Sequence, residues 1–367
     1  MNWQLITLII YFTMLFSLFL TLIIIYVFRC TDVKTGYSET PFISILLAAR
    51  NEEKNIHRCL EALARLNYPA THFEVLIGND QSEDVTAALA EKFTISYPNF
   101  KLIHIESQLG HAKGKANVLA QLAHQAKGEF YFITDADILV PENWIREMLS
   151  YYTPELGTVS GLSLIDDKSI LSQFQNLEWI FAFGMVKVSS EVNIPVSAVG
   201  NNMFITKEAY WSTGGYENIP FSVTEDFQLF RETLKKGWKY KTLANQQILA
   251  YSKPMESFCK VLSQRKRWMQ GAVQLPLPMV IFLSLQSIFF PFILATLALY
   301  PLAGIVLWIM KIFLQNIFNF IFLKRIKQKT DILIYAIPYE LYSGILSVSL
   351  LFYFLIPGVK WKGRKYS

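Results

Sequence analysis

Asp135 and Asp137 are the residues whose types and spacing point most directly to chemistry. They follow the apolar run 130–134, which is typical of a buried strand. Alternate residues of a strand share a face, so both carboxylates can reach one ligand. Two such oxygens suit a hard divalent cation, Mg²⁺ or Mn²⁺, that also holds substrate phosphates. The pair alone also fits a solvated turn after a strand, so its meaning depends on the rest of the chain.

Strands and helices alternate around this pair. Apolar runs predict strands over 42–49, 74–78, 101–105 and 130–134, and helical spacing predicts helices over 55–66, 82–93 and 112–126. This order predicts a doubly wound α/β fold with a mostly parallel sheet, in which ligands bind at the carboxyl ends of the strands. Glu52, Asp80 and the Asp135–Asp137 pair all follow strands, so we expect them at one edge of the sheet.

The sequence offers no glycine-rich phosphate loop. No Gly-x-Gly-x-x-Gly follows the first strand and no Walker motif is present. Phosphates would therefore be held by a metal and by basic side chains. Lys113 and Lys115 open the helix predicted just before the aspartate strand, where helix amides and ammonium groups can meet phosphate. The alternative for these lysines is a solvated helix start.

Two later clusters carry further polar groups. Thr224, Glu225 and Asp226 precede a helix that we expect to begin near Phe227, so simple capping by Thr224 is an alternative to catalysis. The run 264–268, Gln-Arg-Lys-Arg-Trp, lies where globular sequence meets an apolar block. Tryptophan and arginine also favour the headgroup level of a bilayer, so an interfacial anchor is the alternative there.

The composition indicates a membrane protein, with 52% hydrophobic residues and a mean hydropathy of +0.29. Residues 1–28 carry no charge and predict a transmembrane helix rather than a signal peptide. An apolar block over 276–323 has room for about two spans. A third apolar segment over 332–356 contains Glu340 and predicts either a span or a re-entrant piece.

The chain between these blocks reads as globular sequence. We expect residues 29–262 to form one cytosolic domain and 263–275 to form an interfacial helix. The positive-inside rule places this domain in the cytoplasm of a multi-pass protein of the cell membrane, and leaves open the side of the basic tail over 357–367. The basic clusters flank apolar blocks, so they predict contact with the lipid bilayer and no nucleic-acid partner. The three cysteines show no metal-ligand spacing.

The order of four motifs resembles the membrane-bound family-2 glycosyltransferases, a group that includes cellulose, chitin and hyaluronan synthases and the ceramide glucosyltransferases. The motifs are Asp80, Asp135-Ala136-Asp137, Thr224-Glu225-Asp226 and Gln264-x-x-Arg267-Trp268. The resemblance covers roughly 41–271. Shorter matching pieces lie at 49–53, 113–116, 200–203 and 214–216. Each motif is common by itself, whereas the ordered set is specific.

The resemblance implies a GT-A fold, a nucleotide-sugar donor, for which we expect a UDP-sugar, and inversion at the anomeric carbon. Glu52 and Asp80 would contact the nucleoside, and Asp135 the nucleotide. Asp137 would hold the metal together with Asp135. Asp226 would be the general base on the acceptor hydroxyl. Gln264, Arg267 and Trp268 would line the acceptor and diphosphate side, while Arg267 and Lys115 would neutralise the departing charge.

The sequence therefore predicts transfer of one sugar from a nucleotide sugar to a membrane lipid acceptor. A processive polysaccharide synthase using the same site is the main alternative, although about four spans offer little room for a polymer channel. The tail 361–367 resembles the endings of single-addition lipid glycosyltransferases. An aspartyl phosphatase would carry its Asp-x-Asp on the first strand. A transporter or receptor would carry clustered ionisable residues in its spans, and apart from Glu340 no such cluster is found there.

Overall fold

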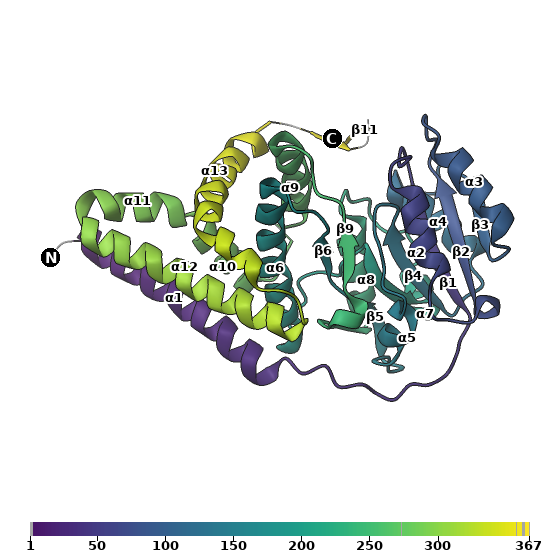
Figure 1. The fold of residues 1–367 in the computed structure, drawn as a ribbon, viewed down its shortest axis with the longest axis horizontal. Helices are drawn as coiled ribbons and strands as arrows, with labels where there is room; N and C mark the ends of the chain where they lie inside the picture. The colour runs from purple at the N-terminus through teal and green to yellow at the C-terminus, as the bar shows by residue number, and fades with distance from the viewer. Residues whose placement is uncertain (1–2, 273, 357, 362–363, 367) are drawn as a thin grey trace.

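The computed structural model describes residues 3–272, 274–356, 358–361 and 364–366. A seven-stranded sheet with the order β3-β2-β1-β4-β7-β5-β8 forms one part, and a group of long helices lies beside it (Figure 1). The strands of this sheet are β1 (Ile43–Ala49), β2 (Phe73–Asn79), β3 (Phe100–His104), β4 (Phe130–Asp135), β5 (Leu156–Ser160), β7 (Asn202–Thr206) and β8 (Lys239–Thr242). All four strands predicted from the sequence are present, with ends that differ by only a residue or so.

The sheet is mostly parallel. Strands β3, β2, β1 and β4 run in one direction, and β5 pairs with β8 in parallel. Strand β7 runs antiparallel to both β4 and β5. This arrangement confirms the predicted α/β fold with a doubly wound, mostly parallel sheet.

Alternation along β1 explains the two layers of helices. Ile45 and Leu47 pack into the core under α2, α3 and α5, whereas Leu46 packs on the opposite face under α4, α7 and α8. Both faces are buried, which is why the strand reads as one apolar run. These helices are α2 (Ile56–Ala64), α3 (Thr86–Ser96), α4 (Lys115–Gln125), α5 (Trp144–Leu149), α7 (Lys207–Ser212) and α8 (Glu225–Lys235).

Helix α3 begins four residues later than the predicted 82–93. Ser82 and Asp84 are used instead to hold the loop after β1, where they accept hydrogen bonds from the Asn51 and Glu53 amides at 3.1 Å each. Polar residues that bond to nearby backbone compete with helix formation. The prediction of a helix from residue 82 was therefore wrong at its start.

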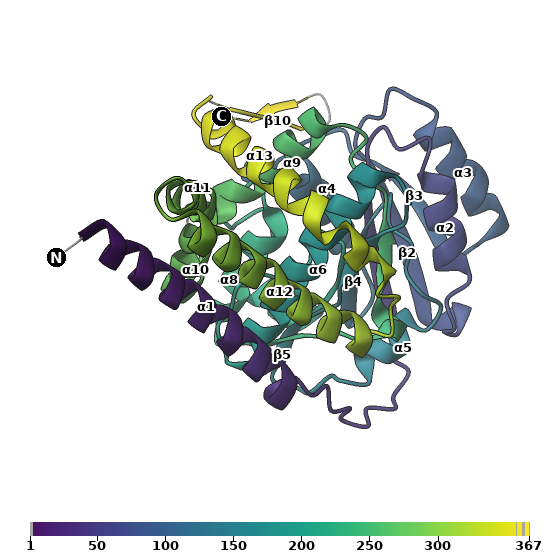
Figure 2. The ribbon, with the colours of Figure 1, turned by 60° about the vertical axis from the view of Figure 1, so that its left-hand side comes forward.

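The remaining helices form the second part of the molecule, shown from another side in Figure 2. They are α1 (Trp3–Arg29), α6 (Ile170–Glu191), α9 (Phe258–Ala272), α10 (Leu277–Ser287), α11 (Phe289–Leu299), α12 (Pro301–Arg325) and α13 (Ala336–Phe354). Short elements complete the described chain: β6 (Ser163–Ile165) with β9 (Ala250–Ser252), β10 (Val359–Trp361) with β11 (Arg364–Tyr366), and the 3-10 turns η1 (Ala70–His72), η2 (Gln246–Ile248) and η3 (Asp331–Tyr335). The predicted basic tail lies partly outside the described residues, at 357, 362–363 and 367.

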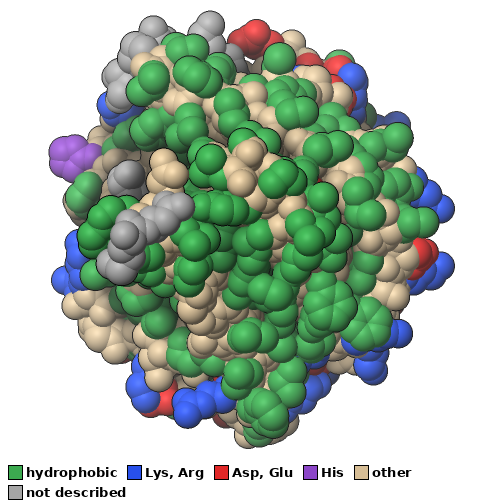
Figure 3. All heavy atoms as spheres, turned by 90° about the vertical axis from the view of Figure 1, so that its left-hand side faces the viewer, with side chains coloured by type: hydrophobic (Ala, Val, Ile, Leu, Met, Phe, Trp, Pro, Cys, Tyr) green, Lys and Arg blue, Asp and Glu red, His purple; other side chains and the backbone are tan. Residues whose placement is uncertain are grey.

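Three described helices are long and apolar enough to cross a membrane: α1, α12 and the continuous stretch of η3 and α13. Helices α10 and α11 form a pair bent by 41°, which gives four crossings if the pair is one span. The face presented by this part of the molecule is largely apolar, with Lys and Arg toward its edges (Figure 3). Exposed apolar side chains on α1 and α12 include Ile9, Ile10, Met14, Leu302, Ile305, Val306 and Ile309.

One pair of buried charges joins α12 and α13. Glu340 of α13 accepts a hydrogen bond from Lys311 of α12 at 2.5 Å, and both side chains are almost fully buried. Charges in apolar surroundings are costly unless they are paired in this way. This contact explains how the third apolar segment tolerates Glu340.

Helix α6 joins the two parts of the molecule. It packs against α1 and α12 on one side and against β6 and β8 on the other. Its buried Lys187 donates to Asp32 and Glu191 at 2.5 Å each and to the carbonyl of Thr242 at 2.8 Å. Sequence reasoning placed this segment within the globular region and did not foresee that it would support the membrane helices.

Candidate active site

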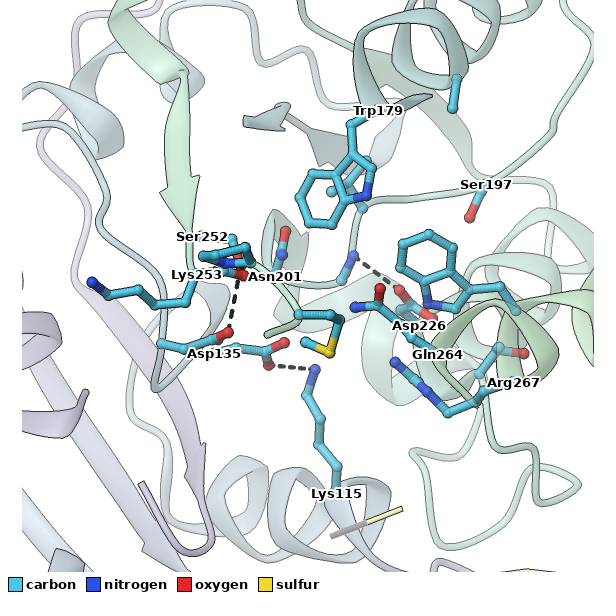
Figure 4. A pocket seen from close by; sticks show the side chains of 18 of the residues that line it. Lys115, Asp135, Trp179, Ser197, Asn201, Asp226, Ser252, Lys253, Gln264 and Arg267 are labelled. Carbon is cyan, nitrogen blue, oxygen red and sulfur yellow. Dashed lines mark hydrogen bonds and ion pairs between the residues drawn. The ribbon is translucent and has the colours of Figure 1, made fainter. Parts of the chain in front are cut away.

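A cavity of about 1140 Å³ lies between the carboxyl ends of β1, β2 and β4 and the helices α6, α9 and α10. Figure 4 shows part of its lining. The candidate residues predicted from the sequence line this cavity, with the exception of Lys113: Glu52, Asp80, Lys115, Asp135, Asp137, Asp226, Gln264, Arg267 and Trp268. Residues more than 200 positions apart in the chain are therefore brought together.

The register of the parallel strands gathers the first carboxylates. Ala49 pairs with Asn79 and Ala48 pairs with Asp135, so β1, β2 and β4 end at the same edge. The amide of Asp80 then donates to the carbonyl of Ala49 at 2.9 Å, which continues the ladder by one bond. Glu52 lies just beyond β1, where its carboxylate accepts from the Asn55 side chain at 2.7 Å.

Lys115 connects two regions of the cavity. Its ammonium lies 2.5 Å from Asp135 Oδ1 and 3.0 Å from Glu225 Oε1. Burial alone would lower the pKa of Lys115, but these two carboxylates outweigh burial and raise it above its usual value. The side chain is thus a fixed cation inside the cavity. Lys113 does not share this position, because it lies over the ring of Phe221 at 5.5 Å and outside the cavity lining.

Asp226 lies in the first turn of α8. This helix begins at Glu225 rather than near Phe227, and the side chain of Thr224 makes no capping hydrogen bond. Oδ2 of Asp226 accepts from the amide of Gly200 at 3.0 Å, and Oδ1 accepts from the amide of Phe227 at 2.8 Å. A side chain on Gly200 would place its Cβ 2.4 Å from Asp226, so only glycine permits this approach.

The pKa values of Glu225 and Asp226 are shifted in opposite directions. For Glu225, the neighbouring Lys115 and Arg267 charges outweigh burial and hold the pKa below its usual value. For Asp226, burial and the charge on Glu225 raise the pKa above its usual value. Glu225 therefore stays ionised beside Lys115, while Asp226 becomes the more basic carboxylate of the two.

Helix α9 carries the last motif into the cavity. Arg267 donates to the carbonyl of Val223 at 3.2 Å, which ties α9 to the segment just before Asp226. The side chain of Gln264 accepts from the neighbouring Arg265. Trp268 is 38% exposed, and its ring centre lies 6.0 Å from that of Trp179 on α6.

Asp135 and Asp137 are the residues present that suit a divalent cation. Both line the cavity, and Ser252 Oγ lies 3.4 Å from Asp137 Oδ2. Among the described residues no group of three or more His, Cys, Asp or Glu side chains has metal-binding geometry. Two carboxylates leave coordination positions for phosphate oxygens and water, as is usual for Mg²⁺ sites. The donor set therefore fits a metal that is held jointly by protein and substrate.

The opposite half of the cavity is apolar. Its walls include Phe183 and Met185 of α6, Val196 of the following loop, and Met279 and Leu283 of α10. Sequence reasoning identified none of these residues, because apolar side chains on apolar helices carry no motif. Trp179, Ser252 and Lys253 were missed because they belong to none of the recognised motifs, whereas Gly200 and Asn201 lay in a short piece of the family resemblance.

The sheet topology, the carboxylates at its edge and the acidic first turn of α8 together define a GT-A glycosyltransferase. The chain belongs to glycosyl transferase family 21, whose family model matches residues 9–367. The predicted resemblance to membrane-bound glycosyltransferases is thereby confirmed, and the chain is an enzyme of this class.

Two curated relatives represent different products. Poly-beta-1,6-N-acetyl-D-glucosamine synthase of Staphylococcus epidermidis is 28% identical over 251 residues, which cover 66% of this chain and 57% of the relative. Beta-monoglucosyldiacylglycerol synthase of Synechocystis sp. is 25% identical over 250 residues, which cover 65% of this chain and 50% of the relative. The chain thus spans only half to three-fifths of the length of these relatives.

A solved structure supports the fold. Mannosyltransferase PcManGT from Pyrobaculum calidifontis, in complex with GDP-Man and Mn²⁺, aligns with a TM-score of 0.57 at 16% sequence identity. The alignment covers 92% of this chain and 99% of that one. At this identity the likeness concerns the fold alone.

Proposed function

We propose that this enzyme transfers one sugar from a nucleotide-sugar donor to a lipid acceptor in the membrane, with inversion at the anomeric carbon. The observation that carries the proposal is the division of one cavity into a polar half at the strand ends and an apolar half at α6 and α10. Asp226, Gln264 and Arg267 line the same cavity, and we propose that the sugar and the acceptor hydroxyl meet beside them.

The polar half suits the donor. Glu52 and Asp80 would hold the nucleoside, for which we expect the uracil of a UDP-sugar. Asp135 and Asp137 would hold Mg²⁺ or Mn²⁺, which supplies Lewis-acid neutralisation of the diphosphate when bound. Lys115 and Arg267 bring two further positive charges to the departing diphosphate. Lys115 would exchange its contact with Asp135 for phosphate oxygens as the donor enters.

Asp226 suits the role of general base. An acceptor hydroxyl must lose its proton as it attacks, and a nearby carboxylate with a raised pKa takes that proton more readily. The hydrogen bonds from Gly200 and Phe227 fix the orientation of this carboxylate. Attack from the side opposite the diphosphate then inverts the anomeric carbon.

The apolar half favours a lipid over a growing polysaccharide. A sugar polymer presents hydroxyl groups that an apolar wall would desolvate at a cost, whereas acyl chains bury favourably there. The curated relative that forms monoglucosyldiacylglycerol supports this reading by its name. The relative that forms poly-N-acetylglucosamine keeps a processive synthase as the alternative.

The proposal includes a position in the cell membrane. With α1, α12 and α13 as spans, Arg29 at the end of α1 and Lys34 just after it favour a cytoplasmic catalytic domain. In a Cys259→Ser background, an impermeant thiol reagent should label Trp3→Cys in intact cells and leave Glu83→Cys unlabelled. The reverse pattern would place the catalytic domain outside.

The function is tested with a panel of radiolabelled nucleotide sugars and membranes that contain the chain. We expect release of the nucleoside diphosphate from one donor and label that extracts into organic solvent. Membranes with Asp226→Asn provide the matched control. Label that stays in water as products of increasing length would show a processive synthase instead.

A further inference from the structure

Trp179 is a buried hydrogen-bond donor that the reaction scheme above does not use. It lies on α6, its side chain is only 6% exposed, and it lines the cavity. Its indole Nε1 has no hydrogen-bond partner among the described residues. Buried tryptophan N–H groups usually find an acceptor, so an unpartnered one on a residue that lines a cavity points to a ligand.

The ring of Trp179 is held in place by its neighbours. Phe183 packs against it edge to face at 5.7 Å, and Trp268 lies 6.0 Å away at 49°. Trp268 is itself held in place, because Arg265 stacks on its ring at 4.3 Å and pairs with Glu178 at 2.6 Å. The direction of the indole N–H is therefore set before any ligand enters, which lowers the entropic cost of a hydrogen bond.

The position of Trp179 is at the boundary between the two halves. Figure 4 shows its ring across the cavity from Lys115, with Asp226 and Gln264 between them and the indole nitrogen on the side of Ser197. Phe183, one turn further along α6, already belongs to the apolar half. A ligand atom that meets Nε1 would therefore lie just beyond the reacting hydroxyl, where a lipid headgroup joins its chains.

We propose that Nε1–H of Trp179 donates a hydrogen bond to a carbonyl oxygen of the lipid acceptor, which selects lipids whose reactive hydroxyl lies a few bonds from an ester or amide. This inference rests on the proposed lipid acceptor and adds a determinant of specificity. A site built around a buried donor rejects analogues that lack the acceptor atom, because the donor is then left unpaired.

The test compares matched acceptors with the full chain in mixed micelles and the donor found in the panel above. Diacylglycerol is paired with dialkylglycerol, which lacks the carbonyls, and ceramide is paired with its thioamide analogue, whose sulfur is a weaker acceptor. We expect kcat/KM to be about five- to tenfold higher for the carbonyl member of the pair that is used. The preferred pair also distinguishes an ester from an amide.

Trp179→Phe keeps the ring and removes the donor. It should lower kcat/KM about five- to tenfold for diacylglycerol or ceramide, whichever is used. The kcat/KM for the matched dialkylglycerol or thioamide analogue should stay unchanged. Trp238→Phe is the matched control, since Trp238 donates to Ser212 at 3.0 Å away from the cavity and its loss should spare both lipids.

Four results would overturn the inference. The first is an equal kcat/KM of the wild-type chain for both members of each lipid pair. The second is a loss of kcat/KM in Trp179→Phe that is equal for all lipids, because such a loss would mean that the ring acts only through packing. A product formed only on lipids without a carbonyl would leave the proposed function standing and overturn this inference. A water-soluble polymer would overturn both.

Discussion

The two halves of the cavity are built in different ways. The polar half takes most of its side chains from strand ends, from the start of α4 and from the first turn of α8, and most of these residues belong to short motifs. The apolar half takes its side chains from α6 and α10, which are far apart in the chain and carry no motif. Bond-making chemistry requires particular functional groups, whereas a place for lipid chains requires only shape and apolar surface. Substitutions should therefore separate turnover from acceptor use.

The largest effect should come from the pair at the end of β4. Asp137→Ala removes one of two carboxylates that suit the cation, so donor binding and transfer should be abolished. Transfer is measured with labelled donor after a thermal-melting check that the variant folds. The exposed Asp331→Ala serves as the control and should remain active. Full activity of the wild-type chain in EDTA would contradict a metal role.

Asp226→Asn should have the next largest effect. The amide keeps the shape of the side chain but cannot take a proton, so kcat should fall about 10²–10⁴-fold. Donor KM should change little, because the carboxylate faces the acceptor hydroxyl. Steady-state kinetics at saturating acceptor separate the two quantities. A loss of donor affinity as large as the loss of kcat would assign Asp226 to binding instead.

The apolar half should respond through the acceptor alone. Leu283→Gln places an amide in the wall of the cavity and should raise the KM for lipid about tenfold, because apolar contact area is lost. Slow hydrolysis of the donor by water should be unchanged. Ile281→Gln is the matched control, since Ile281 lies on the same helix, is 43% exposed and does not line the cavity. An equal rise in lipid KM for Leu283→Gln and Ile281→Gln would contradict a separate acceptor-binding role for the apolar half.

The smallest effect should be a shift in pH dependence. Activity requires ionised Asp226, so kcat/KM falls as the pH drops through its pKa, which lies above the usual value. Glu225→Gln removes the neighbouring negative charge and should lower this pKa, which moves the acidic limb to lower pH. Glu232→Gln on the same helix is the control. An acidic limb that stays in place would show that Glu225 does not influence the base.

Much of the polar half could be predicted from the sequence. Buried parallel strands read as apolar runs, and the polar residues after Ala49, Asn79 and Thr134 must meet at one edge. The start of α8 was harder to predict, because Thr224 has the residue type of a helix cap. The close approach of Gly200 to Asp226 is a tertiary contact, which the local sequence does not reveal. The positions of Trp179 and Leu283 were not predictable, since helix packing decides which apolar side chains line a cavity.

The central claim, one sugar on one lipid, is tested most directly by the mass of the product. The purified full chain is incubated with its nucleotide sugar and with diacylglycerol or ceramide in mixed micelles, and the organic extract is analysed by mass spectrometry. The account predicts a lipid product that is heavier than the acceptor by a single sugar residue and does not grow with longer incubation. A water-soluble series that lengthens by one sugar at a time, with no glycolipid in the extract, would contradict it.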